Sequence, residues 1–194
     1  MDHTHHRSRR NHLRAKSRFA QAGYSLFDLI VTSAVAGVVG LGAVGMTGLV
    51  QDARMTSLVN QLMGDLNLAR GESIKRNVAV TLCKSNDGAS CSDEAAWREG
   101  WIVFADDNKN REVDTNEAII RVQQTLAGDM TLRYGETDTY TYVRYNSSGE
   151  ASRAATFTFC DGRGADKAKA VIVYWTGRPR VSTKTSEDDP LSCS

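Results

Sequence analysis

Hydrophobic and polar residues follow three successive patterns along the chain. From Leu29 to Val50 no side chain is ionisable and most are apolar. Between residues 51 and 77, apolar residues recur at spacings of three and four, which is the period of an amphipathic α-helix. From residue 78 onward, short β-branched and aromatic runs are separated by Gly, Asn, Asp and Ser, a pattern typical of β-strands joined by turns.

The apolar run from Leu29 to Val50 is long enough to cross a bilayer. About 22 residues at about 1.5 Å of rise form a helix of roughly 33 Å, close to the thickness of the hydrocarbon core. One carboxylate, Asp28, stands at the start of this run, and no opposite charge lies within the apolar helix. A charge just inside a membrane span costs about 2.5 kcal/mol or more, so its presence indicates a function and a partner.

We expect the helix to continue from the span without a loop and to end near Asn77. Its apolar stripe predicts packing under a sheet, and consists of Met55, Leu58, Val59, Leu62, Met63, Leu66, Ala69 and Ile74. The strands expected after it are VAVTLCK, GWIVFA, AIIRVQQTL, MTLRY, TYTYVRY, ATFTFC and AKAVIVYWT. The chain therefore divides into a basic leader (1–23), an apolar helix (24–50), an amphipathic continuation (51–77) and a β-rich domain (78–194).

Charge is distributed unevenly. The whole chain carries a net charge of +1, but its first 23 residues hold six basic residues against one acidic residue. Without them the chain is mildly acidic, at −4, which is a poor background for a general nucleic-acid binder. A basic leader before an apolar run predicts targeting to the membrane, with the leader in the cytoplasm and the following domain outside.

The four cysteines, Cys83, Cys91, Cys160 and Cys193, agree with that placement. An even number in an exported domain predicts two disulfides, and three pairings are open from sequence alone. We expect Cys83 with Cys91, closing a short loop, and Cys160 with Cys193, stapling the C-terminal tail. We expect no metal and no cofactor, because there is no CxxC motif and all four histidines lie in the leader.

Two interpretations of the N-terminus remain open. Ala34-Val35-Ala36 offers a signal-peptidase site, although the apolar run before it is short and an equally apolar stretch follows it. The stretch Gly23-Tyr24-Ser25-Leu26-Phe27-Asp28 instead resembles the processing site of type IV prepilins and type II secretion pseudopilins. That resemblance implies cleavage by a prepilin peptidase after Gly23 and N-methylation of Tyr24.

In that family a glutamate occupies the position of Asp28. The resemblance implies that the carboxylate pairs with the α-ammonium of a neighbouring subunit and sets the register of assembly, since an unpaired buried charge is costly. Glycines are frequent in this helix, at Gly37, Gly40, Gly42, Gly45 and Gly48, and Gly45 occupies a position that is often proline in pilins. The segment from Gly37 to Gly45 is therefore expected to unwind inside a filament or to serve close membrane packing.

The β-rich part resembles the GspH/FimT branch of minor pilins over about residues 22 to 183. The resemblance is carried by Thr81-Leu82-Cys83, Trp97, Gly100-Trp101-Ile102-Val103-Phe104, Phe157-Thr158-Phe159-Cys160 and Thr176-Gly177-Arg178. It implies an α+β, type IV pilin-like fold with the long helix packed on an antiparallel β-sheet domain. It also implies a single-pass inner-membrane subunit with a periplasmic domain, found at a filament tip or surface after assembly with other minor and major pilins or pseudopilins.

The loop from Asp106 to Glu117 can be aligned with a twelve-residue calcium-binding loop. The six liganding positions would be Asp106, Asn108, Asn110, Glu112, Asp114 and Glu117. Arg111 stands where such a loop requires glycine, and strands flank it instead of helices. A solvated hairpin loop is the preferred interpretation.

The stretch TGRPR, Thr176 to Arg180, resembles a GRxR motif of FimT-type minor pilins that is implicated in DNA binding during transformation. The candidate contacts to double-stranded DNA, without reading of bases, are Arg178, Arg180, Lys184, Lys167, Lys169 and Arg163. The alternative is a turn after the last main strand, with solvated arginines.

No catalytic constellation is found, and we expect no enzyme. Three roles remain open: a subunit that helps assemble a type IV pilus, a type II secretion pseudopilin, and a DNA-capturing minor pilin.

Overall fold

The computed structural model describes residues 25–193, with the backbone alone for residues 37–46. The basic leader and the Gly23–Tyr24 junction lie outside the described residues. The described residues fall into two units, 25–46 and 47–193.

One helix, α1 (Leu26–Arg76), accounts for the first two sequence patterns, and its backbone remains helical across residues 37–45. It ends where predicted, because Asn77 adopts the left-handed conformation (φ 57°) that often terminates helices. The positive charges of Lys75 and Arg76 in the last turn interact favourably with the negative end of the helix dipole. Among the described residues, no helical stretch is both long enough and apolar enough to cross a membrane.

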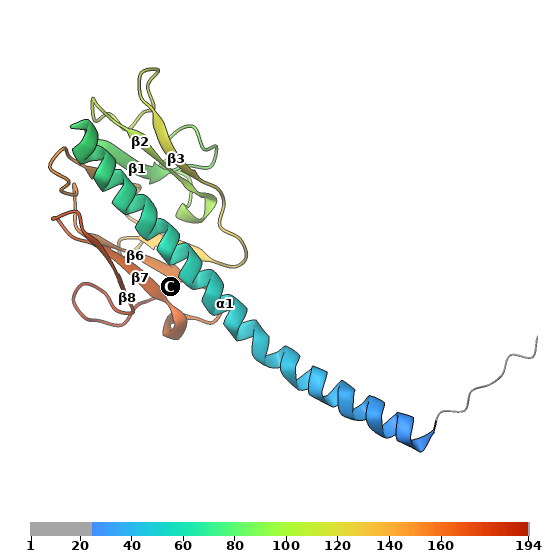
Figure 1. The fold of residues 1–194 in the computed structure, drawn as a ribbon. Helices are drawn as coiled ribbons and strands as arrows, with labels where there is room; N and C mark the ends of the chain where they lie inside the picture. The colour runs from blue at the N-terminus through green and yellow to red at the C-terminus, as the bar shows by residue number, and fades with distance from the viewer. Residues whose placement is uncertain (1–24, 194) are drawn as a thin grey trace, which may run out of the picture. The chain divides into compact units, whose positions relative to one another are not determined.

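The β-strands form two antiparallel sheets rather than one (Figure 1). The first has the order β3 (Ile119–Gln123), β2 (Trp101–Ala105), β1 (Val80–Lys84), β5 (Tyr142–Tyr145). The second has the order β4 (Thr131–Tyr134), β6 (Ala155–Cys160), β7 (Lys169–Val173), β8 (Pro179–Ser182). Two short 3-10 helices, η1 (Trp97–Glu99) and η2 (Ala165–Lys167), complete the regular structure of residues 25–193.

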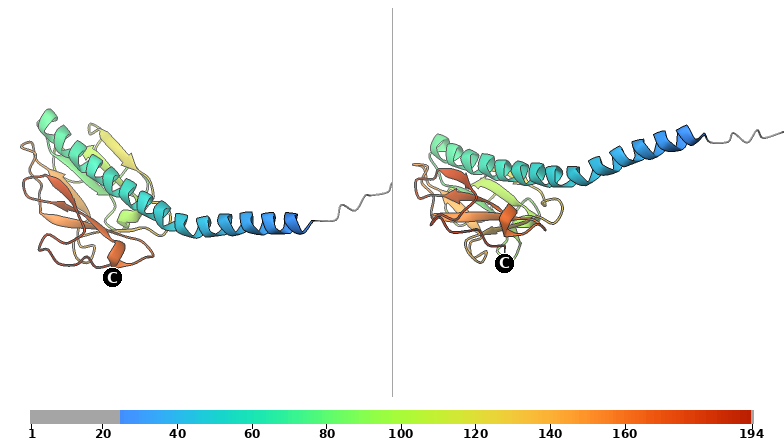
Figure 2. Two further views of the ribbon diagram at one scale, coloured as in Figure 1. Left: turned by 60° about the horizontal axis from the view of Figure 1, so that its bottom comes forward. Right: turned by 90° about the horizontal axis from the view of Figure 1, so that it is seen from below.

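The part of α1 in the second unit lies along both sheets (Figure 2). Five of its apolar residues are at most 2% exposed and recur at spacings of three and four: Met55, Val59, Leu62, Leu66 and Ala69. They share one core with side chains of both sheets, including Val103 of β2 and Phe157 of β6. The ring of Phe157 stacks on the ring of Tyr134 at 3.9 Å between centroids. Ile74, which was predicted in the same stripe, is instead 47% exposed in the last turns of the helix.

Strand β8 was not predicted. Pro179 and Arg180, expected in a turn, are its first two residues and pair with Val173 and Ile172 of β7. Proline is tolerated there because it begins an edge strand, where its missing N–H breaks no ladder.

The structure contains the two disulfides that the cysteine count predicts. Cys83 is joined to Cys91 and Cys160 to Cys193, with sequence separations of 8 and 33. The second bridge fastens the C-terminal tail to β6.

Candidate functional site

The tip of the β7–β8 hairpin is the first candidate site, and a glycine contact positions it. Gly177 adopts φ +73° and donates its N–H to the carbonyl of Tyr174 at 2.8 Å. A β-carbon on Gly177 would lie 1.9 Å from the carbonyl oxygen of Gly149. The same oxygen accepts a hydrogen bond of 3.0 Å from Nε of Arg70 in α1. Glycine is therefore required at this position of the TGRPR stretch, because it allows the hairpin to pack closely against the loop that contains Gly149.

The six basic residues predicted to contact DNA do not form one patch. Arg178 and Arg180 lie at the hairpin and are exposed. Lys169 begins β7, at the opposite end of the strand, and η2 with Lys167 lies just before it. The first and last of the five residues in β7 are separated by roughly 13 Å, at about 3.3 Å for each step.

Several of these cations already have partners. Arg163 forms ion pairs with Asp52 at 2.6 Å and with Asp161 at 2.7 Å. These hydrogen bonds raise the pKa of Arg163 and lower the pKa of both carboxyl groups. Lys184 pairs with Asp188 at 2.8 Å, and Lys169 donates to the hydroxyl of Thr56 at 2.8 Å. The hairpin arginines are thus the better candidates for an external anion.

Two exposed aromatic residues, which were not among the predicted site residues, lie next to those arginines. Trp175 is 63% exposed and Tyr174 is 36% exposed. Nε of Arg180 donates to the Tyr174 hydroxyl at 3.0 Å, and its guanidinium lies 5.5 Å from the ring centroid. No ion pair to Arg178 is found among residues 25–193. In the sequence, this site is indicated by the Tyr174-Trp175 pair, which directly follows the apolar strand β7 and precedes the turn.

Asp28 has a hydrogen-bond partner just before the start of α1. Its carboxylate accepts a hydrogen bond of 3.2 Å from the N–H of Ser25, and the Ser25 hydroxyl accepts one of 3.3 Å from the N–H of Phe27. This reciprocal arrangement resembles a capping box, which satisfies N–H groups that the helix leaves unpaired. The partner is an amide, so the negative charge of Asp28 still has no counter-ion there.

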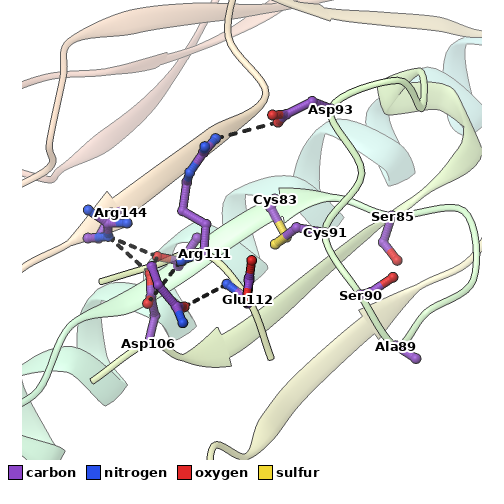
Figure 3. The surroundings of a disulfide bond; sticks show 12 residues. Cys83, Ser85, Ala89, Ser90, Cys91, Asp93, Asp106, Arg111, Glu112 and Arg144 are labelled. Atoms are coloured by element: carbon purple, nitrogen blue, oxygen red, sulfur yellow. Dashed lines mark hydrogen bonds and ion pairs between the residues drawn. A yellow bond between two sulfur atoms is a disulfide. The ribbon is translucent and has the colours of Figure 1, made fainter. Parts of the chain in front are cut away.

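The loop predicted either to bind calcium or to be a hairpin connection joins β2 to β3, which pair antiparallel. Its first residue is not solvated, because Asp106 is fully buried and accepts hydrogen bonds from Thr81 and from Arg144 (Figure 3). Asn108 and Asn110 both donate to the Asp114 carboxylate. Within the part of the chain that the structure describes, no cluster of three metal-ligating side chains is found.

One family model matches the chain. The model of the family "Type II transport protein GspH" matches residues 58–177. The type IV minor pilin FimU of Pseudomonas aeruginosa, solved in two crystal forms, is similar in fold. The first form has a TM-score of 0.53 and 18% identity, over 74% of this chain and 98% of that chain. The second has a TM-score of 0.50 and 17% identity, over 72% and 99%.

The minor pseudopilin EpsH of the Vibrio cholerae type 2 secretion system is also similar. It shares 13% identity over 66% of this chain and 96% of that chain, with a TM-score of 0.49. No curated protein sequence matches the chain.

Proposed function

The chain belongs to the GspH family of type II transport proteins, whose model matches well over half of its length, and we propose that it acts as a minor pilin that helps assemble a type IV pilus. The exposed start of α1 carries this proposal. Leu26, Phe27 and Leu29 are 76%, 70% and 63% exposed. Three large exposed apolar side chains within one helical turn require cover by lipid or by neighbouring helices, which membrane storage and then filament assembly would supply.

The N-terminal chemistry is part of the same proposal. The leader stays in the cytoplasm, prepilin peptidase cleaves after Gly23, and Tyr24 becomes the methylated first residue. The domain after the helix is then periplasmic, and its two disulfides fit an oxidising compartment. Asp28 would pair with the new α-ammonium of a neighbouring subunit, which would give its charge the counter-ion that Ser25 does not provide.

Deletion of the gene tests the role and separates it from type II secretion. Loss of surface pili with normal secretion of exported enzymes would support the pilus role. Loss of secretion with normal pili would assign the chain to a type II secretion system. Complementation with the intact chain should restore whichever function was lost.

Capture of double-stranded DNA is a second candidate. It is supported by the two exposed arginines of the hairpin, Arg178 and Arg180, which could contact phosphates without reading sequence. Exposed Trp175 beside them adds apolar contact area. The other four predicted cations contribute less to this candidate, because three have partners and all lie away from the hairpin tip.

A further inference from the structure

A small cavity beside the Cys83–Cys91 disulfide contains a guanidinium group whose pairing is incomplete. The cavity has a volume of about 170 Å³ and lies between the disulfide loop, the β2–β3 loop and Tyr142 of β5. Among the described residues, the side chain of Arg111 has one ion pair, with Asp93 at 3.5 Å (Figure 3). The two side chains are 39% and 60% exposed, so this pair is weak.

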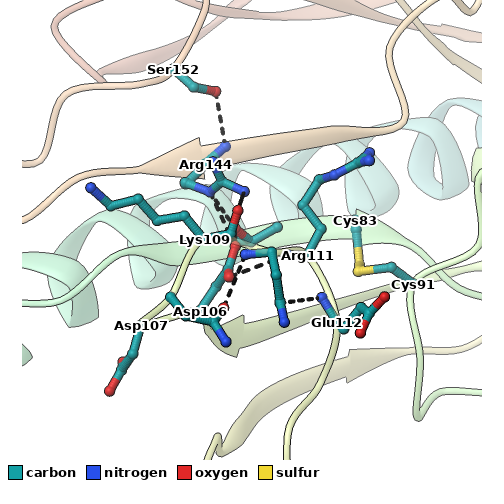
Figure 4. Close-up of polar contacts among 12 residues, drawn as sticks. Cys83, Cys91, Asp106, Asp107, Lys109, Arg111, Glu112, Arg144 and Ser152 are labelled. Carbon is teal, nitrogen blue, oxygen red and sulfur yellow. Dashed lines mark hydrogen bonds and ion pairs between the residues drawn. A yellow bond between two sulfur atoms is a disulfide. The ribbon is translucent and has the colours of Figure 1, made fainter.

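The backbone holds Arg111 in place before any partner arrives. Lys109 and Arg111 have φ values of 64° and 68°, in a region that residues other than glycine rarely populate. Buried Asp106 accepts a hydrogen bond of 3.3 Å from the Arg111 N–H, and Arg144 donates to the Lys109 carbonyl at 2.8 Å (Figure 4). Strained backbone that is fixed in this way is a feature of binding sites.

The ring of Tyr142 gathers positive charge around this cavity. The guanidinium groups of Arg111, Arg144 and Arg153 lie 4.8, 5.3 and 5.3 Å from its centroid. Arg144 has a buried counter-ion in Asp106, at 3.1 Å. No ion pair to Arg153 is found among residues 25–193, and its buried Nε donates to no acceptor there. Three guanidinium groups therefore lie around one ring, and two of them, those of Arg111 and Arg153, are incompletely paired.

We propose that the cavity receives the carboxylate of an Asp or Glu side chain from a neighbouring filament subunit, an inference that rests on the proposed function. A guanidinium group presents a planar fork of N–H donors that matches a carboxylate. The cavity has about the volume of six water molecules, at roughly 30 Å³ each, which suits one acidic side chain. Because stacking and backbone bonds already order Arg111, little conformational freedom is lost on binding.

The lining favours one carboxylate over phosphate groups or DNA. Asp93 and Glu112 also line the cavity. They would repel a doubly charged phosphate or a continuous phosphate backbone more than a single negative charge.

Zero-length cross-linking tests the proposal directly. Arg111→Lys places an amine at this position, and a carbodiimide joins amines to carboxylates that are in contact with them. On assembled filaments of the full chain, mass spectrometry should find an amide between residue 111 and an Asp or Glu of another subunit. Arg98→Lys, at an exposed arginine of η1, is the matched control and should give no such link. A link from residue 111 to Asp93 alone would overturn the proposal.

An assembly measurement separates this site from the proposed function. Arg111→Gln should reduce the amount of the chain in sheared filaments about tenfold, as loss of one desolvated charge pair predicts, whereas Arg98→Gln should not. Thermal melting within a few degrees of the parent would show that the loop is intact. If the parent and Arg111→Gln enter filaments equally, the carboxylate site is wrong and the filament role stands. If the parent itself is absent from filaments, the proposed function fails.

Discussion

The carbonyl oxygen of Gly149 lies 1.9 Å from the position that a β-carbon on Gly177 would occupy. Two loops far apart in sequence are thus in backbone contact, and Arg70 of α1 hydrogen-bonds to the same oxygen. The hairpin that contains Arg178 and Arg180 is therefore linked to the C-terminal part of α1 through the Gly149 loop. Residue 177 has to be glycine both for its conformation and for this close approach.

Gly177→Ala is expected to lower the free energy of unfolding by about 2–4 kcal/mol, because it adds backbone strain and a steric overlap. Two other glycines separate these causes. Gly164 shares a positive φ (+83°) but has open space around it, so Gly164→Ala should cost only about 1 kcal/mol. Gly162→Ala has neither problem and should be nearly neutral. Denaturant titrations of the full chain in detergent would measure all three, and equal losses at 164 and 177 would contradict the steric explanation.

Substitution of Asp28 should distinguish capping from assembly. Asp28→Asn keeps an oxygen that can accept the Ser25 N–H but removes the charge, whereas Asp28→Ala removes both. Both variants should be cleaved after Gly23, as intact-mass analysis would show, and both should enter filaments poorly. Normal incorporation of Asp28→Asn would mean that the carboxylate acts only as a helix cap.

The two disulfides should differ in their contribution to stability. On a chain-entropy estimate, a separation of 33 residues stabilises by about 3.7 kcal/mol and one of 8 residues by about 2.5 kcal/mol. Replacing Cys160 and Cys193 with alanine should therefore lower the melting temperature more than replacing Cys83 and Cys91. Limited proteolysis should then cut first within residues 183–192. If residues 183–192 of this variant stay intact while the protease cuts other loops, the Cys160–Cys193 disulfide does not hold the tail in place.

Acid should destabilise the domain partly through Asp161. Its hydrogen bond from Arg163 lowers its pKa below 3.8, so the stabilisation is present above that pH and is lost as pH falls toward the folded pKa. Asp161→Asn should make unfolding less sensitive to pH as the pH falls below about 4. Asp65 should behave oppositely, because burial raises its pKa and its protonation favours the folded state as pH falls. Asp65→Asn should therefore increase the sensitivity to acid, and stability curves measured at several pH values would reveal both signs.

Salt dependence tests whether the hairpin contacts DNA. Binding of the full chain in detergent to unrelated duplexes should weaken steeply with salt, with a slope of about −0.9 for each phosphate neutralised. Replacing Arg178 and Arg180 with alanine should reduce the slope by up to about two. Lys184→Ala is the control, since Lys184 follows the end of β8 that lies away from the hairpin tip. Absence of salt-dependent binding at low ionic strength would reject DNA capture.

Local patterns were sufficient to predict the amphipathic half of α1 and seven of the strands. Spacings of three and four identified Met55, Val59 and Leu62 as buried, because a helix repeats every 3.6 residues. Strand β8 escaped prediction because its residues, Pro179 to Ser182, include a proline and an arginine and lack an apolar run. The division into two sheets depends on pairing between distant segments, which local patterns do not encode.

The sequence identified individual candidate residues, but it did not show which of them lie together in the fold. GRxR identified Arg178 and Arg180, yet nothing near Arg163 in sequence indicates that Asp52, 111 residues away, pairs with it. The Arg111 cavity is similar, since Arg111 and Asp93 come from two loops that only the tertiary fold brings next to Tyr142. The capping role of Asp28 was local and could have been found, because serine three residues before an acidic residue at a helix start indicates a capping box.

The Cys160–Cys193 bridge also determines how the domain would respond to pulling. A force applied at the C-terminus enters the fold through Cys193 and passes directly to Cys160, at the end of β6. Strands β7 and β8 lie inside this covalent loop, and β6 is held by β4 on one side and β7 on the other. Traction on the tail therefore cannot peel β8 and β7 away one after the other. It has to shear an interior strand against two neighbours at once, which makes the C-terminus a mechanically strong point of attachment.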